Sequence, residues 1–202
     1  NPSGYMGDDA NGNPMYYENQ TDNYKQTHYQ FLLTHTFTPS LTLNAGLHYT
    51  RGKGYYEEYK TDRKLLEYGL IPFEYGNETV KKSDLVRQKW LDNHFGGGVV
   101  SLNYKKNRWD LTFGGAANRY DGDHFGKVIW VKNYIGNLSP DHTFYESNGT
   151  KTDANVYLKA TYSITEGLTA YGDIQYRFID YSIDGQNDTW DWINGEMQKL
   201  DV

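Results

Sequence analysis

The densest group of side chains that could do chemistry is the stretch Asp121-Gly122-Asp123-His124. Two carboxylates and an imidazole so close together are ligand types that calcium or iron could use. Asp and Gly are also the residues that form tight turns, and the stretch follows a strand-like segment. We therefore expect a turn that ends this strand, with Asp121, Asp123 and His124 as the metal candidates of the sequence.

Two histidines, His28 and His48, fall on the polar side of neighbouring strand-like segments and should be diagonal neighbours. A metal site of the zinc type needs three or four ligands, so we expect both to be hydrogen-bonded polar residues. Asp8, Asp9 and Asn11 offer oxygen atoms to calcium, but their spacing does not make a complete EF-hand loop. A solvated turn is expected there.

Aromatic residues in and around the predicted loops are candidates for stacking on a ligand. Together with one arginine on a polar strand face they make the predicted ligand-binding set, which is Tyr55, Tyr56, Trp130, Arg177 and Trp190. No serine, histidine and acid group into a nucleophile site, and no glycine-rich phosphate loop precedes a helix. We therefore predict that the protein is not an enzyme, and we predict no cofactor.

The composition narrows the class of protein. The 202 residues carry a net charge of −6, whereas nucleic-acid binding needs a basic stripe, so no nucleic acid is expected as a partner. Aromatic residues make up 16% of the chain while all hydrophobic residues reach only 37%. No apolar run approaches the roughly 20 residues of a membrane-spanning helix. This balance is typical of sheets whose two faces meet different solvents.

Apolar and polar residues alternate strictly on both sides of a charged turn at residues 105–108. Folding the two arms together gives a hairpin with one apolar face, one polar face and an aromatic residue on each side of the turn. The expected cross-strand pairs are Tyr104 with Trp109, Leu102 with Leu111, and Val100 with Phe113.

Two further hairpins follow the same pattern, in residues 24–49 and 155–177. The first turns at residues 38–40 and the last at residues 163–167. In the first hairpin the expected pairs are Phe37 with Leu41, Leu33 with Ala45, Phe31 with Leu47, and Tyr29 with Tyr49. Its return strand is apolar on one side over residues 41–49, which matches the ~9–11 residues that a tilted strand needs to cross hydrocarbon.

Long polar stretches flank these hairpins. The expected loops are residues 1–23, 60–83, 132–150 and 184–202. A helical turn is expected within residues 64–70. Phe95 and Val99 are opposite in phase to Val100, so a bulge is expected between residues 93 and 98. Short turns that alternate with long loops are typical of bacterial outer-membrane barrels.

Three segments carry a family resemblance: residues 19–24 (NQTDNY), 89–95 (KWLDNHF) and 118–126 (NRYDGDHFG). They resemble TonB-dependent outer-membrane receptors of Bacteroides-type bacteria. The resemblance implies an all-β fold of antiparallel up-and-down hairpins, about six long strands in all, forming part of a transmembrane β-barrel of about 22 strands. Residues 1–202 would be one partial barrel with three hairpins and long extracellular loops. The plug domain is absent, and the chain is expected to be a piece of a longer one.

The same resemblance implies a function. Such receptors lie in the bacterial outer membrane, surrounded by its lipid, and import a scarce solute: an iron chelate, haem, cobalamin or a glycan. The TonB system supplies the energy through the plug domain. The sequence alone leaves two alternatives open, a soluble β-sheet module that binds carbohydrate through loop aromatics, and a small outer-membrane barrel that acts as an adhesin or pore.

Overall fold

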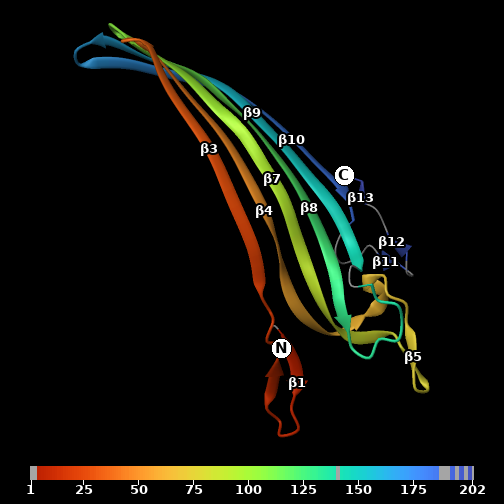
Figure 1. Ribbon diagram of the computed structural model, residues 1–202. Helices are drawn as coiled ribbons and strands as arrows, with labels where there is room; N and C mark the ends of the chain where they lie inside the picture. Colours follow the sequence, from red (N-terminus) through yellow and green to blue (C-terminus); the bar gives the residue numbers. More distant parts are fainter. Residues whose placement is uncertain (1–3, 140–141, 187–191, 194–195, 198–199, 202) are drawn as a thin grey trace.

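A computed structural model describes residues 4–139, 142–186, 192–193, 196–197 and 200–201. One antiparallel sheet dominates it, with the strand order β13-β10-β9-β8-β7-β4-β3. The strands are β3 (Asp22–Thr38), β4 (Leu41–Lys64), β7 (Lys82–Lys106), β8 (Trp109–Val131), β9 (Thr143–Thr165), β10 (Leu168–Gly185) and the short β13 (Leu200–Asp201). Three tight turns lie at one end of the sheet, the turn end, and the long connections lie at the other, the loop end (Figure 1). The predicted all-β hairpin fold is confirmed.

The period of two in the sequence gives the sheet two unlike faces. We call the side that carries Leu102 the apolar face and the opposite side the polar face. Leu102 and Leu158 remain 36% and 43% exposed, so within the described residues no second layer covers them. Other side chains of the apolar face that stay at least 40% exposed include Tyr29, Phe31, Leu33, Leu47, Val100, Phe113, Val156 and Ile174.

Aromatic pairs mark the limits of this apolar band. At the turn end the rings of Trp109 and Tyr162 lie 4.6 Å apart, on neighbouring strands β8 and β9. Toward the loop end the rings of Tyr29 and Tyr49 stack at 6.2 Å, on β3 and β4. Between them the band is aliphatic and phenylalanine-rich, and beyond Tyr49 the same face becomes charged.

The turns are tighter than the sequence predicted. Lys106 pairs with Trp109, so the second hairpin has a two-residue turn in which Asn107 takes a φ of +55°. The predicted four-residue turn is wrong, and the register moves by two residues. Tyr104 therefore faces Leu111. Because the shift is an even number, every side chain keeps its predicted face.

The other two turns also need correction. In the first hairpin Thr38 pairs with Leu41 and a bulge follows Thr36, which removes the predicted pair of Phe37 with Leu41. The other three predicted pairs of that hairpin are confirmed. The last hairpin turns over Glu166 and Gly167 only, because Thr165 pairs with Leu168.

The strands run much further than the apolar pattern. Strand β4 extends to Lys64 and β9 begins at Thr143, so parts of the loops predicted at 60–83 and 132–150 are strand. The predicted N-terminal loop contains a small hairpin, and the predicted C-terminal loop contains another. These and the remaining elements are β1 (Tyr5–Asp8), β2 (Pro14–Tyr16), the 3-10 turn η1 (Leu65–Tyr68), β5 (Phe73–Tyr75), β6 (Glu78–Val80), β11 (Trp192–Ile193) and β12 (Glu196–Met197).

The predicted helical turn is confirmed as η1, whereas the bulge predicted between residues 93 and 98 is not there. Strand β7 pairs without interruption through this segment on both sides, to β4 and to β8. Phe95 and Val99 simply project from the polar face. None of the described helices has the length and apolarity to cross a membrane.

The buried core lies at the loop end. There the connection after β4 folds over the ends of the strands and buries Leu65, Tyr68, Leu70, Phe73, Leu85, Val128, Val131, Phe144 and Tyr145. Asp84 stabilises the start of β7 near this core. Its carboxylate accepts hydrogen bonds from the Tyr59 hydroxyl at 2.8 Å and the Asp62 amide at 3.0 Å, and Lys132 lies 3.5 Å away. Elsewhere on the sheet, the described residues form no such core.

The sheet is open at both sides in the described residues. Strand β3 pairs only with β4, and β10 pairs beyond β9 only at Asp184 and Gly185, with β13.

Candidate functional site

Two adjoining hollows on the polar face form the candidate site. The amide hollow, of about 440 Å³, is lined by Gln26, His28, Tyr29, Gln30, His48, Thr50, Asn93, Phe95 and Tyr120. The tyrosine hollow, of about 590 Å³, lies nearer the loop end and is lined by Asp22, Tyr24, Gly54, Tyr55, Tyr56, Lys89, Trp90, Leu91, His124 and Tyr145. The Tyr24 hydroxyl donates to Asn93 Oδ1 at 3.0 Å and so connects the two.

The two histidines of the amide hollow are diagonal neighbours, as predicted, since His28 pairs with Thr50 and His48 with Gln30. Each has its own hydrogen-bond partner. His28 Nδ1 lies 2.8 Å from Thr50 Oγ1, and His48 Nε2 lies 2.8 Å from Asn118 Oδ1. Among the described residues no three His, Asp or Glu side chains are grouped to hold a metal ion. The two histidines therefore contribute hydrogen-bonding groups to the lining of the amide hollow.

Glycines let large side chains lie flat on this face. A Cβ atom at Gly52 would lie 2.0 Å from the Tyr24 hydroxyl oxygen and 2.4 Å from Asn93 Oδ1. A Cβ atom at Gly97 would lie 2.3 Å from Asn118 Oδ1. Only glycine permits these contacts, so the absence of side chains at these two positions makes room for the polar groups of the hollow.

The tyrosine hollow is mostly aromatic, with one cation. Burial raises the pKa of Tyr145 to about 12. Burial and the neighbouring Arg87 lower the pKa of Lys89. This hollow therefore offers hydroxyl groups and ring faces to a ligand.

A buried ion pair supports the tyrosine hollow at the loop end. Arg87 donates through Nε to Glu58 at 2.8 Å and through a terminal nitrogen to the Tyr68 hydroxyl at 3.1 Å. Burial alone would raise the pKa of Glu58, but Lys60 and Arg87 outweigh it and the pKa is lowered. Arg87 thereby joins the sheet to η1, where Tyr68 lies, and its charge is already satisfied.

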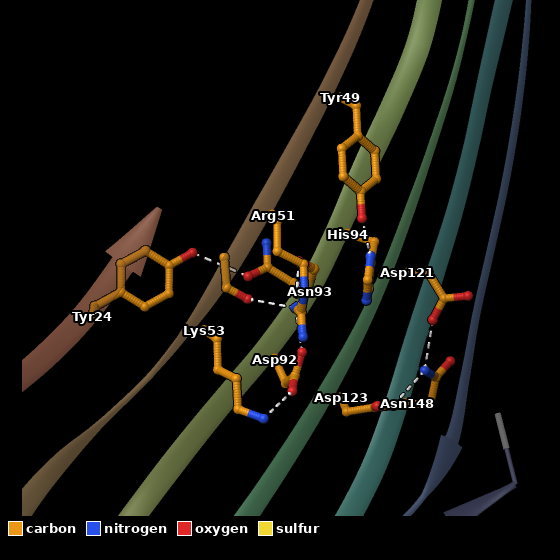
Figure 2. Close-up of polar contacts among 11 residues, drawn as sticks. Tyr24, Tyr49, Arg51, Lys53, Asp92, Asn93, His94, Asp121, Asp123 and Asn148 are labelled. Atoms are coloured by element: carbon orange, nitrogen blue, oxygen red, sulfur yellow. Dashed lines mark hydrogen bonds and ion pairs between the residues drawn. The ribbon is translucent and has the colours of Figure 1, made fainter. Parts of the chain in front are cut away.

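The acid–histidine stretch is not a turn, because β8 continues through it to Val131. Asp121 and Asp123 project from the apolar face, and the side-chain amide of Asn148 donates to both, at 2.8 and 2.7 Å (Figure 2). His124 points to the other face and lines the tyrosine hollow. The structure therefore brings together the two carboxylates and separates the histidine from them.

Together with Arg51, Lys53 and Asp92, these two aspartates form a band of charges on the apolar face beyond Tyr49, which we call the charged collar (Figure 2). In it Asp92 forms ion pairs with Arg51 and with Lys53, the latter at 2.9 Å. The Tyr49 hydroxyl lies 2.5 Å from His94 Nδ1 at the edge of the collar. The collar marks where the apolar band ends. Arg51, Lys53 and Asp92 are paired with one another, while Asp121 and Asp123 share the side-chain amide of Asn148.

The predicted ligand-binding residues separate over the two faces. Tyr55 and Tyr56 both line the tyrosine hollow. The ring of Tyr55 lies tilted against that of Trp90 at 4.5 Å, and Trp90 in turn stacks with Phe125. Trp130 packs toward Tyr59 in a separate apolar hollow of about 350 Å³.

Arg177 lies on the polar face of β10 and forms a bidentate contact with Asp153. Trp190 falls outside the described residues. Of the predicted set, only Tyr55 and Tyr56 line either hollow.

Sequence reasoning missed most of the amide hollow. Phe95, Tyr120 and Asn93 were not among the candidates, although all three line it. The signal was available: Phe95 is an aromatic residue in the polar phase of its strand. Alternation alone interprets this phase as a bulge, whereas Phe95 forms part of the floor of the amide hollow.

No protein-family model matches the chain, and no curated protein matches it. Inferences about function therefore depend on the exposed apolar face of the sheet and on the hollows of its polar face.

Proposed function

We propose that this chain is part of the wall of an outer-membrane TonB-dependent receptor, which binds a scarce solute and imports it. The observation that carries the proposal is the exposed apolar band between two aromatic borders. A single sheet with such a band needs a covering layer, and lipid is the layer that matches its composition.

The two ends of the sheet support the same orientation. Tight turns at one end and long, packed connections at the other match short periplasmic turns and longer external loops. The candidate site lies on the polar face toward the loop end, where a solute arriving from outside would first meet the wall. The proposed role is binding and transfer, in which no covalent bond is made or broken, driven through TonB and a plug domain.

Labelling with a lipid-soluble photoreactive probe tests the membrane part of the proposal. The purified protein is placed in lipid vesicles, illuminated and digested, and the adducts are located by mass spectrometry. We expect adducts at Leu102 and Phe113, and none at the neighbouring Asn103 and Thr112, which project from the polar face. A protein that stays soluble and monomeric without detergent, with Leu102 protected, would favour the soluble module instead.

The energy source has its own test. Cells that depend on the receptor for growth on its solute should lose that growth when TonB is deleted, while passive pores would still supply it. Retained growth would contradict an importer of this kind and favour the small barrel.

A further inference from the structure

We infer that the amide hollow binds a neutral, polyhydroxylated ligand, an uncharged oligosaccharide, and not an anionic metal chelate. This inference rests on the proposed function, since it names the class of solute that the same wall would handle. It depends on three features of the hollow: its lack of charge, its unused hydrogen-bonding groups and its aromatic floor.

The polar face is uncharged over a wide area around this hollow. No Lys, Arg, Asp or Glu is among the described residues that line it. The uncharged area covers four strands, with these polar side chains: Gln26, His28, Gln30, Thr34, Asn44, His48, Thr50, Asn93, Ser101, Asn103, Thr112, Asn118 and Tyr120. Charge returns on β9 and β10: Arg177 and Asp153 neutralise each other, whereas Lys151 lies opposite Tyr120 and Lys159 opposite Thr112, at the border of the uncharged area. An anionic chelate is recognised by Arg and Lys side chains, and neither type is among the described residues that line the hollow.

The hydrogen-bonding groups suit hydroxyls. Gln26 and Gln30 are exposed, and their side-chain amides make no hydrogen bond to any other described residue. Each amide both donates and accepts, as a sugar hydroxyl does. His28 engages Thr50 through Nδ1 only, so its second ring nitrogen faces the hollow's solvent. These groups can therefore pair with vicinal hydroxyls without a change in charge.

The floor of the hollow is aromatic. Phe95 is 37% exposed, and its ring lies 4.9 Å from that of His48. An apolar ring face suits the C–H face of a sugar ring, while Tyr120 beside it adds a hydroxyl. The volume of about 440 Å³ lies within the roughly 300–1,000 Å³ of small-molecule sites. The adjoining tyrosine hollow adds hydroxyls and ring faces toward the loop end, together with the charged side chains of Asp22 and Lys89.

Binding is measured by calorimetry on the protein in detergent micelles. The probes are neutral hexasaccharides of glucose, mannose and xylose, a hexamer of galacturonic acid, and a ferric tris-catecholate. Three variants alter the hollow, Gln30→Ala, His48→Ala and Phe95→Ala, and Gln175→Ala on the polar face of β10 is the matched control. We expect at least one neutral hexasaccharide to bind, with Kd raised about tenfold by Gln30→Ala and by His48→Ala. The control should leave Kd unchanged.

Three results would overturn the inference: preferred binding of the acidic hexamer or the ferric chelate, neutral-sugar binding that the three variants leave unchanged, or no binding of any probe at millimolar concentration. Gln30 is exposed on edge strand β3, so its alanine variant should fold even if Phe95→Ala does not. The lipid-probe experiment separates the two proposals. Labelled Leu102 without sugar binding removes only the ligand class, whereas sugar binding by a soluble monomer removes the importer and leaves the sugar site.

Discussion

Replacing Val100 with arginine tests whether lipid or water is the neighbour of the apolar face. Val100 lies near the middle of the band on β7, is 49% exposed, and pairs with Ala45 on one side and Gly115 on the other. These small neighbours leave room for the larger side chain, and neither offers a carboxylate. The cost of Val100→Arg is therefore almost entirely the cost of placing its charge in the surrounding medium.

In hydrocarbon that cost is roughly 2–4 kcal/mol near the midplane, which corresponds to roughly a 30- to 900-fold shift in the folding equilibrium. In water the cost would be within about 0.5 kcal/mol of zero, as for most surface substitutions. The adjacent Ser101→Arg supplies the control, because Ser101 projects from the polar face between Asn44 and Gly114.

The measurement is urea unfolding of both variants and the parent protein in lipid vesicles, followed by tryptophan fluorescence. We expect Val100→Arg to lower the free energy of unfolding by the amount above and Ser101→Arg to change it by less than about 1 kcal/mol. If the two arginines cost the same, or if Val100→Arg has no effect, lipid is not the neighbour of this face.

Three further predictions concern the loop end and the polar face. Phe144→Ala should lower the free energy of unfolding by about 3–5 kcal/mol, because Phe144 is fully buried in the only core of the described residues; a denaturant titration measures the loss. Gly54→Ala should destabilise more than Gly52→Ala in the same assay. The new Cβ at residue 54 would lie 2.1 Å from a backbone oxygen, whereas at residue 52 it meets the movable end of Tyr24. Burial alone would raise the pKa of Asp84, but the Asp62 amide, Tyr59 and Lys132 outweigh burial and lower it. The ionised Asp84 therefore stabilises the fold fully above the unfolded pKa of about 4, and this stabilisation is lost as pH falls through the folded pKa. Asp84→Asn should remove that part of the acid dependence of the unfolding midpoint, and an unchanged acid profile would show that Asp84 does not contribute.

The faces of the sheet were predictable, because a period of two assigns each side chain to a side whatever the exact pairing. The two-residue error at the second hairpin shows the limit. Composition marks 105–108 as a turn, but the choice of a tighter turn depends on the φ of +55° at Asn107, which alternation does not encode. The bulge after Thr36 is likewise a local backbone choice.

The site was less predictable, because its parts come from strands far apart in sequence. His48 meets Asn118 across 70 residues, and only the registers of two strand pairings, β4 with β7 and β7 with β8, bring them together. The strand segments at residues 60–64 of β4 and 143–150 of β9 were also missed. There the strands are covered on one face by packed loops and charged on the other, so the alternation that marks a strand in two solvents disappears.

The unpaired side of β3 has a consequence for how the sheet reaches a bilayer. Along its 17 residues roughly half of the backbone amides and carbonyls point away from β4, and no strand of the described residues pairs with them. In hydrocarbon each such group costs several kcal/mol. In the proposed receptor, insertion of one hairpin at a time would therefore be strongly unfavourable, and β3 would have to pair with a further strand before or during its insertion into lipid.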